Sequence, residues 1–213
     1  MSNEFELVLG TRNAKKVVEL RDLLRNDPVC LKMLDKFPTS VEVEETGTTF
    51  EENAILKATT QARAISAWVL AEDSGLSVEA LGGQPGVYSA RFAGPGATDS
   101  DNNDRLMRDL KNVPLEKRTA WYTCHACLSD PDGKILISCQ AHCYGRIVAE
   151  PRGVAGFGYD PYFEVPEYHL TFAELGLAVK SVISHRAKAM RLFLREFRPL
   201  LSKQSAVVQV SSM

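Results

Sequence analysis

The sequence has little excess of either charge. It contains 25 lysine and arginine residues against 27 aspartate and glutamate residues, which gives a formal net charge of −2 at pH 7. Proteins that bind nucleic acid usually carry a basic excess or a basic stripe along one face. We therefore expect no nucleic-acid partner, and positive charge is available only in local patches.

Long apolar runs are also lacking. No stretch approaches the roughly 20 apolar residues that a membrane-spanning helix needs. The first ten residues, MSNEFELVLG, do not show the basic segment and long apolar segment of a secretory signal. We expect a cytoplasmic protein that is neither exported nor bound to a membrane.

The cysteines do not indicate a disulfide framework. There are five of them, an odd number, and without an export signal this favours reduced thiols. Two groups have spacings that zinc ligands can show: Cys124, His125 and Cys127, and Cys139, His142 and Cys143. Both groups lie in predicted strands, along which Cys124 and Cys127 point to opposite faces. We favour buried core cysteines over the zinc alternative.

The rest of the composition is that of a globular protein. A chain of 213 residues is long enough to bury a continuous apolar core without metals or disulfides. Strand and helix patterns alternate along it, and residues 119–148 predict one long hairpin around Asp130–Gly133. This order of elements predicts an α/β fold with a mixed sheet.

The individual elements follow from apolar spacing and capping residues. They are a strand at 5–10, a helix after 11–13, a short strand at Val41 and Val43, a helix from 50 to about 66 behind a capping box of Thr49 and Glu52, a buried strand at 68–71, a helix at 99–111, the hairpin, and a last helix from about Ser184. The strand at 68–71 is expected to end at Glu72 and Asp73. We predict one domain at 1–201 and a disordered C-terminal tail at 202–213.

Three polar segments offer chemistry suited to a polyphosphate. The turn at 11–16 opens a helix, whose free backbone N–H groups and dipole suit a phosphate, although it lacks the glycine and hydroxyl of a P-loop. Glu45, Glu72 and Asp73 supply carboxylate oxygens of the kind that Mg²⁺ takes, but the two adjacent acids cannot face the same way along a strand. Residues 184–186 offer donors for a carbonyl or phosphate, and His185 is a possible acid or base. Each segment alone has an ordinary interpretation as a helix start or solvated surface.

Taken together, six segments resemble the inosine triphosphate pyrophosphatases. In family order they are T-R-N-A-K-K (11–16), E-E-T-G-T-T-F-E-E-N-A-I-L-K-A (44–58), A-E-D-S-G-L (71–76), L-G-G-Q-P-G-V-Y-S-A-R (81–91), G-F-G-Y-D-P (156–161) and K-S-V-I-S-H-R (180–186). One such segment is weak evidence, whereas six in register over residues 7 to about 200 are highly specific. The resemblance implies Mg²⁺-dependent hydrolysis of ITP, dITP and XTP to the nucleoside monophosphate and pyrophosphate.

The resemblance also implies an architecture. Members of this family have an elongated mixed β-sheet with flanking helices, two lobes around a nucleotide cleft, and usually a homodimer. We therefore expect a purine nucleoside triphosphate substrate and a second copy of the chain as partners.

Site residues are implied by the same resemblance. The triphosphate would be held by Thr11, Arg12, Asn13, Ala14, Lys15, Lys16 and Lys57. Glu45 and Asp73 would organise Mg²⁺, Asp73 would accept the proton of the attacking water, and Ser74 would contact substrate. The base would be enclosed by Phe157, Gly158, Tyr159, Asp160, Lys180, His185 and Arg186, with Phe157 stacking on it. Two positions depart from the family pattern, because many relatives have Gly at Lys15 and Asp at Glu72.

Three other functions stay open. A related pyrophosphatase of methylated or pyrimidine triphosphates would share the reaction but not the base pocket. A phosphatase or kinase would release or transfer orthophosphate instead of pyrophosphate. A non-catalytic nucleotide-binding module would bind without turnover.

Overall fold

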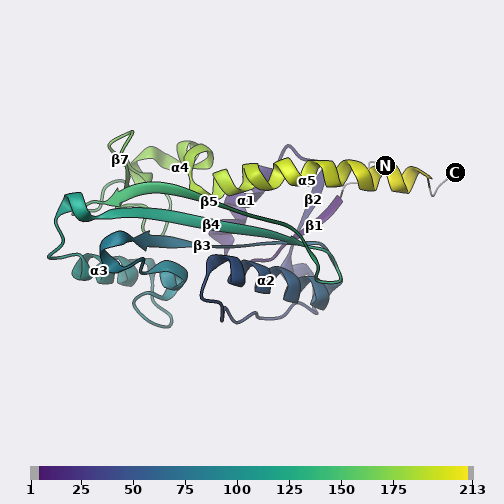
Figure 1. The fold of residues 1–213 in the computed structure, drawn as a ribbon, viewed down its shortest axis with the longest axis horizontal. Helices are drawn as coiled ribbons and strands as arrows, with labels where there is room; N and C mark the ends of the chain where they lie inside the picture. Colours follow the sequence, from purple (N-terminus) through teal and green to yellow (C-terminus); the bar gives the residue numbers. More distant parts are fainter. Residues whose placement is uncertain (1–4, 211–213) are drawn as a thin grey trace. The chain divides into compact units, whose positions relative to one another are not determined.

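The computed structural model describes residues 5–210, and it describes side chains for residues 5–202. Among these residues, seven strands form one mixed sheet in the order β2-β1-β3-β4-β5-β6-β7, with helices flanking it (Figure 1). This confirms the predicted α/β class. The chain divides into two compact units. Unit 1 contains the chain up to Asp73, His125–Gln140 and the chain from Ala189, and unit 2 contains Ser74–Cys124 and Ala141–Lys188.

Unit 1 is built around parallel strands. Its elements are β1 (Phe5–Leu9), α1 (Ala14–Leu24), β2 (Val29–Met33), the 3-10 turn η1 (Leu34–Lys36), α2 (Phe50–Ile65), the start of β3 (Val69–Val78), the turn end of the β4–β5 hairpin, and α5 (His185–Val210) from Ala189 onward. β1 runs parallel to both β2 and β3, with Val8 opposite Val69. The strand at 5–10, the first helix and the capping box of α2 are confirmed.

Alternation along the strands divides the core of unit 1 into two layers. Leu7 and Leu9 pack with apolar residues of α1 and α5. Val8 points the other way, onto Ala54 and Ala58 of α2. Figure 1 shows α2 on one side of these strands and α5 on the other. The small side chains of α2 let the helix approach the sheet closely, so polar residues beside them come within reach of β3.

Unit 2 has its own aromatic core. Its elements are the rest of β3, η2 (Glu79–Leu81), η3 (Gly86–Arg91), α3 (Asp99–Asp109), η4 (Leu115–Lys117), most of β4 (Thr119–Ser129) and of β5 (Ile135–Ile147), β6 (Phe163–Val165), β7 (Leu170–Thr171) and α4 (Phe172–Ile183). The rings of Phe163 and Phe172 stack with centroids 5.1 Å apart, and Tyr122 lies 4.8 Å from Phe163. The predicted helix at 99–111 is confirmed as α3.

The predicted hairpin is also confirmed. Its turn is closed by Asp130, whose Oδ1 accepts hydrogen bonds from the backbone N–H groups of Asp132 and Lys134. Gly133 adopts a positive φ of 82°, which favours glycine. The cysteines of the hairpin are buried and form no disulfide, as favoured from the sequence: Cys124, Cys127, Cys139 and Cys143.

Several boundaries differ from the sequence predictions. Val41 and Val43 lie in irregular structure, so the predicted strand there is wrong, and β2 lies instead at Val29–Met33. β3 does not end at Glu72 but continues to Val78, because the two acids that follow Ala71 are neutralised within the strand. α4, β6 and β7 were not predicted. α5 continues to Val210, past residue 202 where the predicted tail begins, and residues 211–213 of that tail lie outside the described residues.

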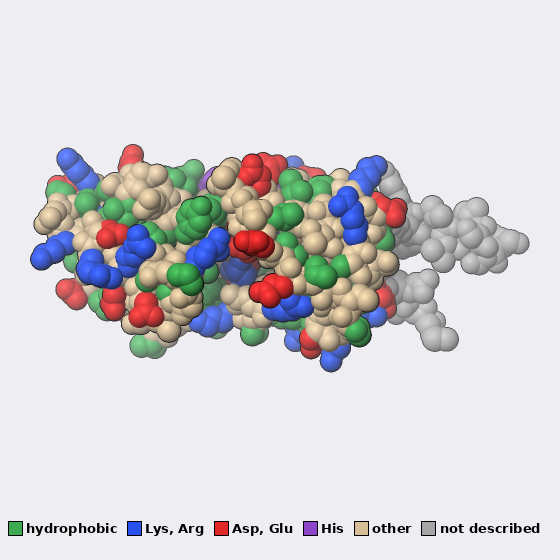
Figure 2. Space-filling model, turned by 90° about the horizontal axis from the view of Figure 1, so that it is seen from below, with side chains coloured by type: hydrophobic (Ala, Val, Ile, Leu, Met, Phe, Trp, Pro, Cys, Tyr) green, Lys and Arg blue, Asp and Glu red, His purple; other side chains and the backbone are tan. Residues whose placement is uncertain are grey.

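The described surface matches the balanced composition. Figure 2 shows acidic and basic side chains intermingled over the face that it presents. Within residues 5–210, no helix combines the length and the apolar character needed to cross a membrane.

Candidate active site

Asp73, Lys57 and Glu45 form the centre of a polar cluster in unit 1. The alternation of β3 places Asp73 on the face that α2 covers. The Lys57 ammonium donates to Asp73 Oδ1 and to Glu45 Oε1, each at 2.8 Å. Asp73 is 5% exposed, so this pairing takes place largely out of water. Two predicted metal ligands and one predicted phosphate ligand are therefore brought together.

Asn53 links the same cluster to the segment before α2. Its side-chain Nδ2 lies 3.4 Å from Asp73 Oδ2, while its Oδ1 accepts from the backbone N–H of Gly47 at 2.8 Å. A Cβ at Gly47 would lie 2.6 Å from Asn53 Oδ1, so only glycine allows this approach. Asn53 was not predicted from the sequence. Its polar side chain among the apolar positions of α2 was the available signal.

Burial makes Asp73 a stronger base than an ordinary aspartate. Removal from water raises the pKa of its carboxyl, and the nearby charges of Lys57 and Lys16 offset this only in part. Burial acts to lower the pKa of Lys57, but the carboxylates of Asp73 and Glu45 outweigh it and the pKa is raised. Lys57 therefore stays charged, beside a carboxylate that holds a proton more readily than usual.

Glu72 points to the opposite face of β3, toward α1. Its side chain is fully buried and pairs with Lys16, with Nζ 2.9 Å from Oε1. The two adjacent acids thus diverge as strand geometry requires. A buried carboxylate without a partner would be strongly destabilising. Lys16 therefore stabilises the fold by pairing with Glu72, in addition to its predicted role in phosphate binding.

The turn at 11–16 is more closed than the sequence predicted. Asn13 caps α1, and its Oδ1 accepts from the backbone N–H groups of Lys15 and Lys16 at 3.0 and 3.3 Å. Two of the N–H groups that we expected to be open to a phosphate therefore contact the cap residue in this structure. Thr11 Oγ1 accepts from the Asn13 N–H. Ala14 and Lys15 are exposed, and Lys16 is partly exposed. A phosphate at this turn would therefore contact mainly side chains.

Arg12 reaches away from this turn. Its Nη2 donates to Ser40 Oγ at 2.9 Å, and its Nη1 lies 3.4 Å from the carbonyl oxygen of Val41. In the structure it therefore contacts the segment that leads to Glu45.

A second polar cluster lies in unit 2, in the glycine-rich loop. Asp160 is almost fully buried, and its Oδ2 accepts from the Lys180 ammonium at 2.6 Å and from the Phe157 N–H at 2.9 Å. Lys180 Nζ lies 4.3 Å from the centre of the Phe157 ring. A Cβ on Gly156 would overlap the Asp160 carboxylate, which explains the glycine. Asp160 thus fixes the backbone of Phe157 and neutralises Lys180 through one oxygen.

Helix α3 holds the tip of this loop. Asn103 Nδ2 donates to the Gly158 carbonyl oxygen at 2.9 Å, and the Gly158 N–H donates to Asp99 Oδ2 at 3.0 Å. Tyr159 is buried, and its hydroxyl donates to the carbonyl oxygen of Ser89 at 2.8 Å. Asn103 and Asp99 were not predicted from the sequence, because no local signal marks a contact 55 or 59 residues away.

The start of α5 supplies the remaining predicted residues of unit 2. The His185 ring stacks on Tyr122, with centroids 4.6 Å apart and planes 9° from parallel. Arg186 is buried, and its Nη2 donates to Ser74 Oγ at 2.9 Å. Tyr122 was missed by the sequence analysis. Its ring holds the imidazole plane in a fixed orientation.

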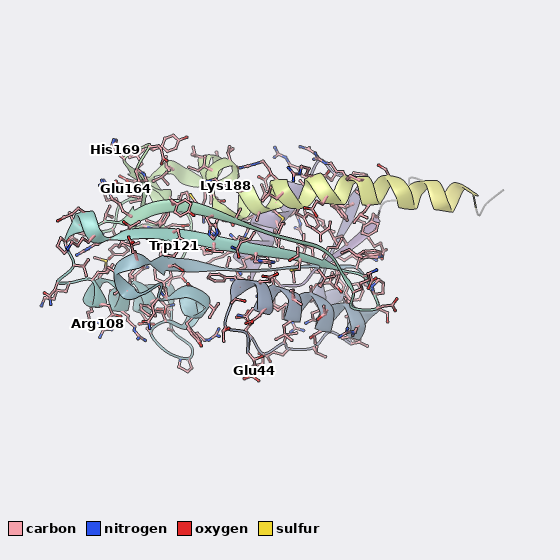
Figure 3. All side chains as sticks on the ribbon, viewed as in Figure 1. Glu44, Arg108, Trp121, Glu164, His169 and Lys188 are labelled. Atoms are coloured by element: carbon pink, nitrogen blue, oxygen red, sulfur yellow. The ribbon has the colours of Figure 1, made fainter. Side chains whose placement is uncertain are left out.

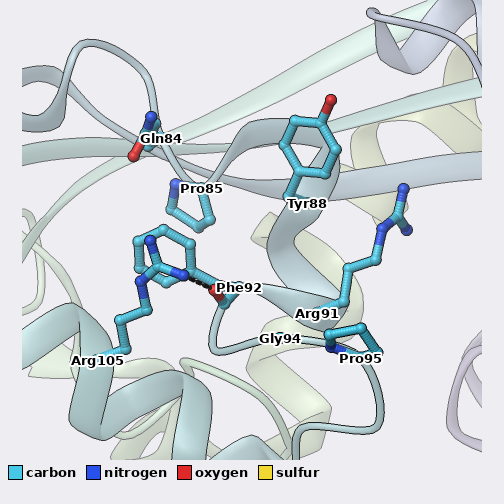
Figure 4. A pocket seen from close by; sticks show the side chains of 8 residues that line it. All are labelled: Gln84, Pro85, Tyr88, Arg91, Phe92, Gly94, Pro95 and Arg105. Atoms are coloured by element: carbon cyan, nitrogen blue, oxygen red, sulfur yellow. Dashed lines mark hydrogen bonds between the residues drawn. The ribbon is translucent and has the colours of Figure 1, made fainter.

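Unit 2 also contains a pocket formed by η3 and the loop after it (Figure 4). Arg105 lies over the ring of Phe92 at 4.2 Å and donates to its carbonyl oxygen, and Arg91 lies 5.3 Å from the ring centre of Tyr88. The lining residues are Gln84, Pro85, Tyr88, Arg91, Phe92, Gly94, Pro95 and Arg105. None of them is a predicted site residue, although the segment 81–91 supplies four.

The donor set of unit 1 fits a magnesium ion. Glu45 and Asp73 direct carboxylate oxygens at a single cationic group, the ammonium of Lys57. Mg²⁺ prefers hard oxygen donors and is usually held by one or two carboxylates together with substrate phosphates and waters. No group of three or more His, Cys, Asp or Glu side chains suited to a metal occurs in the described part of the chain. In a metal site here, the protein would thus supply two carboxylates, and the substrate phosphates would supply further ligands.

Comparison with known proteins matches this chain over most of its length. The model of the Ham1 family matches residues 7–196. The dITP/XTP pyrophosphatase of Rhodopirellula baltica is 52% identical over 205 residues, which cover 96% of this chain and 99% of that protein. The corresponding protein of Desulforamulus reducens is 47% identical over 186 residues, covering 87% and 92%.

Solved structures give the same result for the fold. The structure of a HAM1 protein from Coxiella burnetii matches with a TM-score of 0.82 and 38% identity, covering 89% of this chain and 96% of that one. The Staphylococcus aureus Ham1 protein also has a TM-score of 0.82, at 36% identity, covering 91% and 98%.

Proposed function

Because this chain belongs to the Ham1 family, we propose that it is a nucleoside-triphosphate pyrophosphatase that hydrolyses ITP, dITP and XTP. The products are the nucleoside monophosphate and pyrophosphate, so the enzyme removes deaminated purines from the nucleotide pool. The observation that carries this proposal is the buried Asp73, which shares the Lys57 ammonium with Glu45. That arrangement combines a base, a cation and an oxygen donor pair in one place.

Glu45 and Asp73 would hold Mg²⁺ together with substrate phosphates and waters. The ion, when bound, neutralises phosphate charge and orients the triphosphate. Lys16 and Lys57 offset the negative charge that develops on the leaving pyrophosphate. Lys16 is already held in place by a carboxylate at 2.9 Å, so little ordering of this side chain is needed when substrate arrives.

Asp73 would accept the proton of the water that attacks the α-phosphorus. Its raised pKa makes it a better proton acceptor than an ordinary aspartate. Lys57 contacts one carboxylate oxygen and Asn53 contacts the other, so the carboxylate plane is fixed. A fixed base orients the water, which is the main requirement of phosphoryl transfer besides charge neutralisation.

The base would be read by residues of unit 2. Phe157 offers an aromatic face for stacking, and its backbone is fixed by Asp160. Lys180, His185 and Arg186 are donors that suit a 6-oxo group. The 6-amino group of ATP would set donors against donors, and a mismatch of this kind discriminates by roughly 10⁴ to 10⁵.

We also propose that the enzyme works as a cytoplasmic homodimer. The resemblance to the family supports this proposal. Sedimentation equilibrium of the full chain tests the dimer, and a monomer at micromolar concentration contradicts it.

Incubation with Mg²⁺ and equal amounts of ITP, dITP, XTP, ATP and GTP, with identification of the products, tests the function. We expect monophosphate and pyrophosphate from ITP, dITP and XTP, and little product from ATP. Conversion of ATP as fast as ITP removes the base specificity. Release of orthophosphate in place of pyrophosphate identifies a phosphatase, and faster turnover of methylated or pyrimidine triphosphates identifies the related pyrophosphatase.

A further inference from the structure

Helix α2 presents three polar side chains at four-residue spacing along one face: Asn53, Lys57 and Gln61. This spacing stacks them along the helix. Each contacts a different point of the irregular segment 41–47, in which Glu44 is marked in Figure 3. Asn53 accepts from Gly47, Lys57 donates to Glu45, and Gln61 pairs with Val41. The segment that carries Glu45 is therefore attached to the helix at its start, middle and end.

Gln61 makes the first of these attachments with both ends of its amide. Its Nε2 donates to the Val41 carbonyl oxygen at 2.5 Å, and its Oε1 accepts from the Val41 N–H at 3.3 Å. The side chain is only 3% exposed. Val41 lies outside any strand, so Gln61 satisfies backbone groups that a neighbouring strand would otherwise pair.

Asn53 and Lys57 also contact Asp73, whereas no hydrogen bond between Gln61 and Asp73 is found among the described residues. The role of Gln61 in the acidic cluster is thus exerted through the backbone of the segment 41–47. Without it, this segment would lose two of the hydrogen bonds that fix its start. A longer free segment has more conformations to lose when Glu45 takes up a ligand position.

We propose that Gln61 is a positioning residue that holds the segment 41–47 so that Glu45 and Asp73 face the same cation. This inference rests on the proposed function, because it assigns Glu45 and Asp73 to a divalent ion. Arg12, which lies just before α1, also contacts the start of this segment, through Ser40 and Val41. Neighbours of metal ligands that fix the orientation of those ligands commonly change metal affinity by about 10- to 100-fold when they are removed.

The test is Mn²⁺ binding by the full-length protein saturated with a non-hydrolysable ITP analogue, whose phosphates supply the further ligands, measured from the electron paramagnetic resonance signal of free Mn²⁺ without turnover. Gln61→Met keeps the side-chain length and removes both hydrogen bonds to Val41. Gln61→Asn is a milder second variant that keeps the amide but is too short to span both backbone groups. Thr59→Val is the matched control, because it removes a hydrogen bond within α2, to the Ile55 carbonyl oxygen, and none to the segment 41–47.

We expect Gln61→Met to weaken Mn²⁺ binding on the order of 10-fold. Gln61→Asn should fall between Gln61→Met and the wild type, and Thr59→Val should match the wild type. Wild-type affinity in both folded Gln61 variants, or an equal loss in Thr59→Val, overturns the positioning role. If Asp73→Asn binds Mn²⁺ as tightly as the wild type, the metal centre of the proposed function fails instead. The two failures are therefore distinguishable.

Discussion

Glu72 and Asp73 are neighbours in β3 whose carboxylates pair with lysines on opposite faces of the sheet. Glu72 pairs with Lys16 of α1 at 2.9 Å, and Asp73 pairs with Lys57 of α2 at 2.8 Å. Two adjacent residues of β3 thus anchor both α1 and α2. Asp73 also faces a second acid, Glu45, through the shared lysine. We therefore propose that Asp73 performs the chemistry, whereas Glu72 anchors the turn at 11–16 through Lys16.

Removal of the Lys16 charge should destabilise the fold. Lys16→Met leaves the fully buried Glu72 carboxylate without its ion-pair partner. We expect the free energy of unfolding to fall by about 3–5 kcal/mol. Urea denaturation at pH 7 measures the change.

The double variant Lys16→Met, Glu72→Leu is the matched control for this change. Since it removes the buried charge as well as its partner, most of the lost stability should return. ITP hydrolysis should stay low, because the phosphate still lacks Lys16. Full recovery of both properties would show that Lys16 serves the fold alone.

The sequence predicted the elements that are marked by local signals. Thr49 and Glu52 gave the start of α2, and Asp130 with Gly133 gave the hairpin turn, because capping and turn contacts span a few residues. The end of β3 was misplaced for the opposite reason. Glu72 and Asp73 resemble a strand terminus until their partners at Lys16 and Lys57 are known, and those partners are distant in sequence.

The candidate site was predictable to a similar extent. Asp73, Lys57 and Glu45 came from the family segments, and the structure brings these three together. The supporting residues were not found, since Asn103 and Tyr122 act through contacts that only the folded chain creates. β2 was also not predicted, because its residues are all half-buried and show no alternation between buried and exposed side chains.

Glu164 should make stability depend on pH. This residue of β6, labelled in Figure 3, accepts from Arg146 Nε at 2.7 Å and from Arg152 Nη2 at 2.5 Å. Burial acts to raise the pKa of Glu164, but the two arginines outweigh it and the pKa is lowered from its usual 4.5. A carboxyl with a lowered pKa in the folded state contributes stability above pH 4.5, and this contribution is lost as pH falls through the folded-state value.

Glu164→Gln measures this contribution. At pH 7 we expect the variant to unfold with a free energy lower by roughly 1 kcal/mol, because Arg146 and Arg152 lose their anion but are themselves partly exposed to water. Below pH 4.5 the difference from the wild type should shrink as Glu164 in the wild type takes up a proton. Urea titrations at pH 7 and at low pH check this, and a difference that stays constant with pH contradicts it.

Asp160 should control substrate affinity more than turnover. Asp160→Asn keeps an acceptor for the Phe157 N–H but removes the charge that balances the buried Lys180. Because Phe157 and Lys180 would contact the base, KM for ITP should rise on the order of 10-fold, as expected for loss of one charged hydrogen bond. Steady-state kinetics of this variant measure the effect, with the exposed Glu116→Gln as control. A fall in kcat at unchanged KM would place Asp160 in a different role.

The most direct test of the account is the rate of pyrophosphate release from ITP by wild type and Asp73→Asn, with nucleotide binding measured in parallel. The substitution keeps the shape of the side chain but removes its charge and basicity. We predict that kcat falls by roughly 10²- to 10⁴-fold, as for loss of a general base, while ITP affinity changes little. A variant that releases pyrophosphate at a rate near that of the wild type would contradict the assignment of the chemistry to Asp73.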